Sequence, residues 1–222
     1  MYSLPRLEMR HPLDLVIPSD YRRGVLISLL VPTVLLWGIL RSLQAGLNTG
    51  TTGKAPQGML SFELAGDPLV THAIFNAGAG GWDAASITSA ETALLLDYAF
   101  LLCYSTTLAL GCVWASKLWV TPRMTELGAW LAWGQLAAAI CHAMENFALL
   151  RIAQDSFSTS FFIATGVVQD GFAISFARFC AFAKYGLIEA GLLYIAISGF
   201  NLGIGPVLRL RLSPRRLIAS AK

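Results

Sequence analysis

The chain has 222 residues, of which 55% are hydrophobic and only 13% are charged, and its mean hydropathy is +0.61. A soluble domain usually carries about 25% charged residues, so the composition excludes an ordinary water-soluble fold. The net charge of +3 is small and scattered along the chain, which argues against nucleic acid as a partner.

The first long apolar run covers residues 24–43 and follows two arginines, Arg22 and Arg23. Its length matches the roughly 20 residues that a helix needs to cross the hydrocarbon core of a bilayer. The apolar region of a cleavable signal peptide is shorter, so we expect this segment to be retained as a first membrane span. Pro32 predicts a kink within it.

The segment 44–92 is the longest connection between apolar runs, and its pattern predicts that it is partly helical. Residues 59–65 have the pattern of a short amphipathic helix. Asp67 then stands as the N-cap of a second short helix, with Pro68 as its first residue. We expect the apolar faces of these helices to rest on the membrane surface or on the bundle.

Three further apolar runs follow this connection. Thr88 and Glu91 have the spacing of a capping box, which predicts that a helix starts there and leads into a span at 93–116. The later runs predict spans at 126–150 and 172–200. The predicted fold class is therefore all-α, a polytopic membrane protein with four transmembrane helices.

The distribution of lysine and arginine predicts the orientation. Four arginines precede the first span, two basic residues lie between the second and third, and five follow the fourth, against three on the opposite side. Positive loops stay in the cytoplasm, so the tails 1–23 and 201–222 should be cytoplasmic and the segment 44–92 external. We expect residues 1–222 to form one membrane domain.

Ionisable residues inside the spans are the main functional signal. A charged side chain in the bilayer centre costs about 2.5 to 3.5 kcal/mol, so such residues usually face a partner or a cavity. His142, Glu145 and Asn146 share one face of the third helix because they are three and four residues apart. The predicted depths place Asp97 and Glu145 at the level of Arg178, and we expect the two carboxylates to pair with this guanidinium.

Lys184 and Glu189 lie deeper in the fourth span, and we expect them to form a second pair near the mid-plane. Two interpretations of these residues stay open. Ion pairs can fix the register of helices in a bundle, where lipid offers no hydrophobic drive for association. The same groups can also form a proton path, a ligand site or an acid/base centre. The sequence identifies no catalytic residue.

The spacing of His142 and Glu145 invites a metal interpretation, because Glu-x-x-His motifs build di-iron sites in helical bundles. A second such motif is missing, and the other histidines, His11 and His72, lie outside the predicted spans. We therefore predict no metal and no cofactor. A haem or chlorin bound through His142 is the alternative that the single buried histidine leaves open.

Three short motifs carry a resemblance to known proteins: Phe62-Glu63-Leu64-Ala65, Leu96-Asp97-Tyr98 and Glu145-Asn146. Together they resemble a loosely defined group of uncharacterised bacterial four-helix integral membrane proteins. In that group an acidic residue commonly precedes Glu-Asn by three positions, where this chain has His142. The resemblance implies that Glu63, Asp97, Glu145 and Asn146 share one polar centre, and it implies no substrate.

These features predict a bacterial inner membrane or photosynthetic membrane location. The first functional expectation is an accessory or structural subunit that packs against a larger respiratory or photosynthetic complex, with lipid and other membrane subunits as partners. The alternative is a small membrane enzyme or carrier that handles a lipid-like substrate or protons. That alternative would use Asp97, His142, Glu145 and Arg178.

Overall fold

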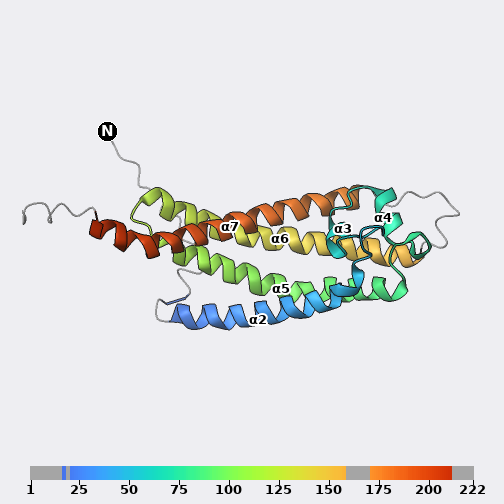
Figure 1. The fold of residues 1–222 in the computed structure, drawn as a ribbon, viewed down its shortest axis with the longest axis horizontal. Helices are drawn as coiled ribbons and strands as arrows, with labels where there is room; N and C mark the ends of the chain where they lie inside the picture. The colour runs from blue at the N-terminus through green and yellow to red at the C-terminus, as the bar shows by residue number, and fades with distance from the viewer. Residues whose placement is uncertain (1–16, 19–20, 159–170, 212–222) are drawn as a thin grey trace, which may run out of the picture.

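The computed structural model describes residues 17–18, 21–158 and 171–211. Within these ranges every regular element is helical. Four helices are long, and Figure 1 shows them lying lengthwise beside one another: α2 (Arg22–Gln44), α5 (Ala84–Ser116), α6 (Pro122–Ser158) and α7 (Gly171–Arg211).

All four long helices have the length and the apolar character that a membrane span requires. They fit a multi-pass membrane protein, as the four apolar runs predict. The start of α2 and the end of α7 lie at the same end of the molecule (Figure 1), together with the turn between α5 and α6. The terminal tails that we expect in the cytoplasm lie mostly outside the described residues.

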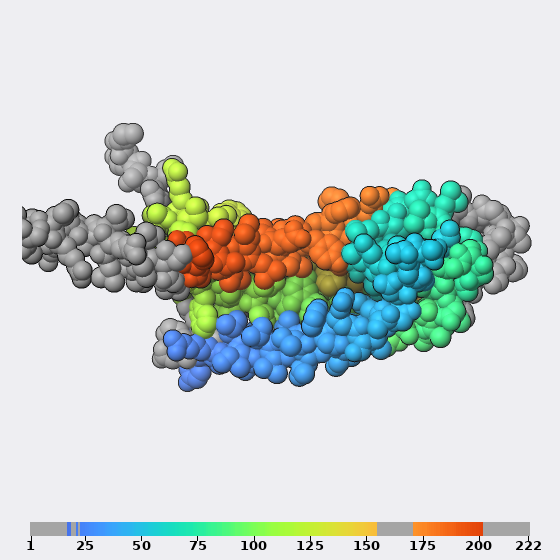
Figure 2. Space-filling view, in the orientation of Figure 1, coloured from blue at the N-terminus to red at the C-terminus, as the bar shows by residue number. Residues whose placement is uncertain are grey.

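Helices α5, α6 and α7 form the centre of the bundle, and α2 packs mainly along α5. In Figure 2, α2 is the blue ridge along one side. The side chains of α2 are largely exposed, as a lipid-facing helix requires, and Thr33 Oγ1 lies 3.4 Å from Thr107 Oγ1 of α5.

The second span starts earlier than the capping-box pattern predicts. Helix α5 begins at Ala84, and the carboxylate of Asp83 accepts a hydrogen bond from Ser86 N at 2.8 Å. The hydrogen bonds from Ser86 hold the pKa of Asp83 below its ordinary value. Thr88 lies inside the helix, where its hydroxyl donates to Ala84 O. Asp83 therefore takes the capping role, because an aspartate that precedes the first helical residue reaches the free N–H groups there.

The connection between α2 and α5 folds into a cap on one end of the bundle. It contains η2 (Ala45–Leu47), α3 (Met59–Glu63), α4 (Pro68–Ile74) and η3 (Ala77–Ala79). Asp67 caps α4 through Leu69 N at 2.7 Å, as the sequence predicts. Figure 2 shows this cap filling the end of the molecule between α2 and α7.

An aromatic cluster holds the cap together. Phe62, Phe75 and Trp82 meet edge to face, with ring centroids 5.1 to 5.7 Å apart. The indole N–H of Trp82 donates to Leu47 O at 2.7 Å, which ties the end of the cap back to its beginning. Such contacts add about 0.5 to 1.5 kcal/mol per pair beyond the burial of area. The cap is therefore a packed unit that fixes the position of Glu63.

The ends of the later spans also differ from expectation. Helix α7 continues to Arg211, well past the predicted end at residue 200. Helix α6 extends to Ser158, and the rest of the polar stretch before α7 lies outside the described residues. Because the hydrocarbon core of a bilayer is about 30 Å thick, helices of this length are longer than one crossing requires.

Candidate functional site

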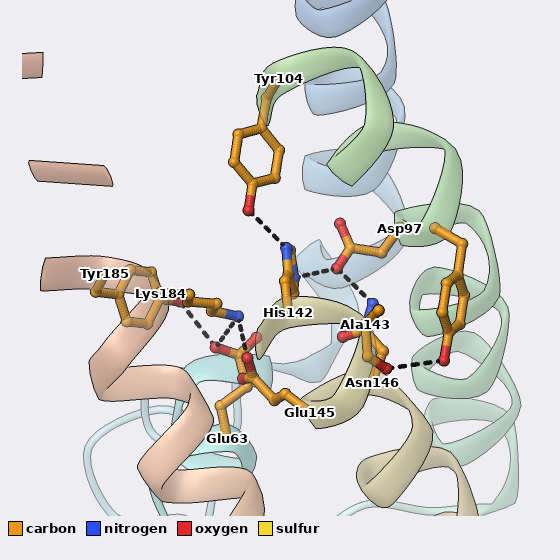
Figure 3. Close-up of polar contacts among 10 residues, drawn as sticks. Glu63, Asp97, Tyr104, His142, Ala143, Glu145, Asn146, Lys184 and Tyr185 are labelled. Atoms are coloured by element: carbon orange, nitrogen blue, oxygen red, sulfur yellow. Dashed lines mark hydrogen bonds and ion pairs between the residues drawn. The ribbon is translucent and has the colours of Figure 1, made fainter. Parts of the chain in front are cut away.

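A histidine between two helices is the first part of the site. His142 of α6 places Nε2 at 2.6 Å from Oδ2 of Asp97 on α5. Its other ring nitrogen, Nδ1, lies 3.1 Å from the hydroxyl of Tyr104, also on α5. Figure 3 shows the imidazole held between these two groups. The order Tyr104, His142, Asp97 is a continuous chain along which protons can shift.

The same carboxylate accepts a second bond from α6. The amide Nδ2 of Asn146 donates to Asp97 Oδ2 at 2.9 Å. On the same turn of α6, the backbone oxygen of Ala143 accepts a hydrogen bond from the hydroxyl of Tyr98 at 3.1 Å. Asp97 therefore bonds to both ends of one helical turn of α6, which fixes how α5 and α6 lie against each other.

The second part of the site is a lysine of α7 that pairs with one carboxylate of α6 and with one of the cap. The ammonium of Lys184 on α7 lies 2.7 Å from Glu145 Oε2 and 3.4 Å from Glu63 Oε2. The hydroxyl of Tyr185 donates to the same oxygen of Glu63 at 2.8 Å. Figure 3 shows Lys184 reaching between the two carboxylates. One lysine is thus shared by a residue of the bundle and a residue of the cap.

Glu145 is the most deeply enclosed of these groups, with 0% of its surface exposed. The ion pair with Lys184 reaches only its Oε2. No described residue donates a hydrogen bond to its Oε1. Burying an ionised carboxylate without full hydrogen bonding is costly, and binding a proton removes that cost.

The charges of the site do not balance. We call the set of ionisable side chains in contact here the buried cluster: Glu63, Asp97, His142, Glu145 and Lys184. It contains three carboxyl groups but only one ammonium and one imidazole. With every carboxyl ionised and the imidazole neutral, the cluster carries an excess of two negative charges. The uptake of two protons makes the cluster neutral, which is the state that a low-dielectric interior favours.

The local sequence explains how α6 contributes three side chains to the site. The residues at positions 142, 145 and 146 lie within about one turn, so their side chains project from the same face. Glu63 is the last residue of α3, and the packed cap points it at the bundle. The sequence predicts the face of α6, whereas the approach of the cap depends on its tertiary packing.

The cation of the site is not the predicted one. Arg178 is exposed, and its guanidinium lies over the ring of Phe182, 5.6 Å from the centroid, and next to Gly66 of the cap. Lys184 takes its place beside the carboxylates. Because six residues turn an α-helix by about 600°, residues 178 and 184 point about 120° apart. Only one of them can face the interior.

The expected deeper pair does not form. Glu189 is exposed on α7, while Lys184 points into the cluster. Their separation of five positions corresponds to a rotation of about 500°, which places the two side chains about 140° apart. Glu63, Asp97, His142, Glu145 and Asn146 are brought together, whereas Arg178 and Glu189 lie outside.

Two tyrosines of the site are absent from the sequence prediction. Tyr104 lies seven residues after Asp97, on the same face of α5, and this two-turn spacing is the signal that identifies it. Tyr185 is adjacent to Lys184, and its role depends on the position of Glu63. Nothing in the local sequence of α7 indicates that the cap reaches this residue.

The described residues contain no group of three or more His, Cys, Asp or Glu side chains placed to hold a metal ion. Both ring nitrogens of His142 already face protein groups, Asp97 and Tyr104. An axial bond to a haem or chlorin would require one of these contacts to break. The arrangement is therefore chemically suited to proton exchange among oxygen and nitrogen groups.

These observations fit one class of molecule: a multi-pass helical membrane protein with ionisable groups buried between its helices and under the cap. Comparison with protein families, with curated proteins and with solved structures gave no match. The function is therefore inferred from the chemistry of the buried cluster alone.

Proposed function

We propose that this protein binds and releases protons at the buried cluster and acts as a small proton-handling carrier. The observation that supports the proposal is Glu145, a fully enclosed carboxyl group with one oxygen unpartnered among the described residues. It shares a single lysine with Glu63. A site with more carboxyl groups than cations gains or loses protons as the pH changes.

The protons enter from the side of the cap. The side chain of Glu63 is 13% exposed, whereas Glu145 is enclosed and its ion-pair partner Lys184 is only 3% exposed. A proton that reaches Glu63 weakens its attraction for Lys184, which then pairs with Glu145 alone. Glu63 thus serves as the external acceptor, and Lys184 couples its state to that of the interior.

The proposal is tested by infrared difference spectroscopy of the purified protein between about pH 5 and pH 8. The wild type should show a carboxyl C=O band whose amplitude changes with pH. Glu145→Gln should remove that band, because the amide keeps the shape of the side chain but does not ionise in this pH range.

The matched control is Glu126→Gln, which makes the same change on the same helix at an exposed position. Its spectrum should retain the band that Glu145→Gln removes. A wild-type spectrum identical to that of Glu145→Gln over this pH range would overturn the proposal.

A structural role is the second candidate, and one observation favours it. The cluster joins α5, α6, α7 and the cap through side chains alone. Such bonds fix the register of a helical bundle, as an accessory subunit of a larger membrane complex requires. In that case Glu145→Gln would lower the thermal stability of the protein and release it from a native complex. The infrared spectrum of the wild type would then show no carboxyl band that changes with pH.

We further propose an inner or photosynthetic membrane of a bacterium as the location, with both termini in the cytoplasm. The support is the excess of lysine and arginine next to the start of α2, the turn before α6 and the end of α7. Labelling of single cysteines in intact cells tests the orientation. A reporter thiol in the cap should react from outside, whereas one in the turn at Lys117 should not.

A further inference from the structure

A second set of polar side chains continues from the buried cluster toward the opposite end of the bundle. Gln135 of α6 is 0% exposed and donates from Nε2 to Leu187 O of α7 at 2.8 Å. Its Oε1 has no hydrogen-bond partner among the described residues. A buried amide oxygen is almost always bonded, and ordered water is the usual partner when protein is not.

Gln135 lies two turns below His142 on the same face of α6, about 10 Å closer to the cytoplasm at 1.5 Å per residue. Tyr104 lies the same number of residues below Asp97 on the antiparallel α5. The backbone of Tyr104 is therefore level with Gln135, and its hydroxyl reaches back to His142. The tyrosine side chain therefore extends from the level of Gln135 to the buried cluster.

Beyond Gln135, further polar side chains lie toward the opposite end of the bundle. A Cβ on Gly191 would clash with Gln135 Nε2 and would lie 3.5 Å from Cys112 Sγ, so these two side chains meet at that glycine. Four residues further along α5 comes Ser116, which lies beside Gly128.

The row then reaches the cytoplasmic end through α7. The Tyr194 hydroxyl also lies beside Gly128, and it donates to Met124 O at 2.8 Å. Ser198 donates to Tyr194 O and accepts from the indole of Trp119 at 2.8 Å. Trp119 is partly exposed in the turn between α5 and α6. We call the whole set the inner polar row: Gln135, Cys112, Ser116, Tyr194, Ser198 and Trp119.

We propose that Gln135 holds a water molecule that passes protons between the buried cluster and the inner polar row, so that the protein conducts protons across the membrane. This inference rests on the proposed function and extends it from one side of the bilayer to both. The water accepts a proton from the side of Tyr104 and releases another toward the cytoplasm. The amide of Gln135 orients it and is itself unchanged.

The test is proton flux into vesicles that contain the purified full-length protein and an internal pH dye. A potassium gradient with valinomycin supplies the driving force. Wild-type vesicles should acidify or alkalinise faster than protein-free vesicles. Gln135→Leu should abolish the protein-dependent flux, because leucine keeps the volume of the side chain but cannot hold the water.

Gln154→Leu is the matched control, since it makes the same change at an exposed position of α6. It should conduct like the wild type. If Gln135→Leu fails to fold, Gly191→Ala serves instead, because its Cβ displaces the Gln135 amide. Its flux should also be lost.

The two proposals fail in different ways. Wild-type vesicles without flux, or a Gln135→Leu variant with wild-type flux, would overturn the conduction pathway. The infrared band of Glu145 would then still report proton binding from the external side. If the wild-type protein shows neither the proton flux nor the pH-dependent infrared band, the proposed function is overturned as well.

Discussion

The half of the bundle under the cap, external in the orientation proposed above, and the opposite, cytoplasmic half place polar side chains between the helices in different ways. In the external half, charged side chains from separate segments bond to one another, as Lys184 does with Glu145 and Glu63. In the cytoplasmic half, neutral side chains bond mainly to backbone oxygens, as Gln135 does with Leu187 and Tyr194 does with Met124.

This difference indicates which half of the protein can respond to pH. A neutral donor bonded to a carbonyl keeps its bond at any physiological pH. A carboxylate bonded to an ammonium loses most of that attraction when it takes up a proton. We therefore expect the external half to respond to pH and the cytoplasmic half to be indifferent to it.

The largest effect should follow from Lys184→Met, which leaves the carboxyl groups of Glu63 and Glu145 without their ammonium. Breaking a buried ion pair by removing one partner costs about 3 to 5 kcal/mol of unfolding free energy. The loss should be greater near about pH 8 than near about pH 5, because acid protonates the carboxyl groups that remain. Unfolding in detergent at both pH values measures it.

Arg178→Met is the comparison for this prediction, because it removes a cation from the same helix outside the cluster. An exposed cation contributes about 0 to 1 kcal/mol. Equal costs for Lys184→Met and Arg178→Met would contradict the assignment of Lys184 as the cation of the cluster.

His142→Leu should have the next largest effect. It leaves the hydroxyl of Tyr104 and the carboxylate of Asp97 without their shared partner. A buried polar group left unbonded costs about 1 to 3 kcal/mol. Combining this variant with Asp97→Asn in a double-mutant cycle measures the coupling between the two residues. Additive costs would show that the contact contributes nothing to stability.

Gly66→Ala tests the junction of the cap with α7. Gly66 has φ of +62°, and a Cβ there would clash with Cδ of Arg178. The left-handed conformation alone costs an L-residue about 1 to 2 kcal/mol. Hydrogen exchange should show faster opening of the cap. Gly186→Ala has open space around it and should leave exchange in the cap unchanged.

Tyr194→Phe should have the smallest effect and should sharpen the contrast between the halves. It removes the bond to Met124 O, which is worth about 0.5 to 1.5 kcal/mol. The cost should be the same in acid and in base, because no group at this bond titrates there. A strong pH dependence would show that the cytoplasmic half also carries charge.

The local sequence predicted several features because they depend on neighbouring residues. Helix lengths follow from uninterrupted apolar runs, and the cap of α4 follows from Asp67 before Pro68. The shared face of His142, Glu145 and Asn146 follows from helical spacing alone. The start of α5 was predicted wrongly, since two acceptable capping residues, Asp83 and Thr88, compete within five positions.

The choice of cation could not be predicted in the same way. Arg178 and Lys184 both lie in the external half of α7, and the sequence does not reveal how that helix is rotated. The rotation is set by packing against α5 and α6, where small side chains of α7 such as Ala177 and Ala181 are buried. Lys184 faces inward as a result, and Arg178 turns to Phe182.

By itself, the sequence determined that four helices would be apolar enough to span a membrane and that ionisable groups would lie within them, because hydrophobicity and helical spacing are properties of short stretches of chain. Only the tertiary structure decided which of these groups meet. The contact of Glu63 with Lys184 joins residues 121 positions apart. Such a contact depends on how the cap and the helices pack, and no local pattern records that.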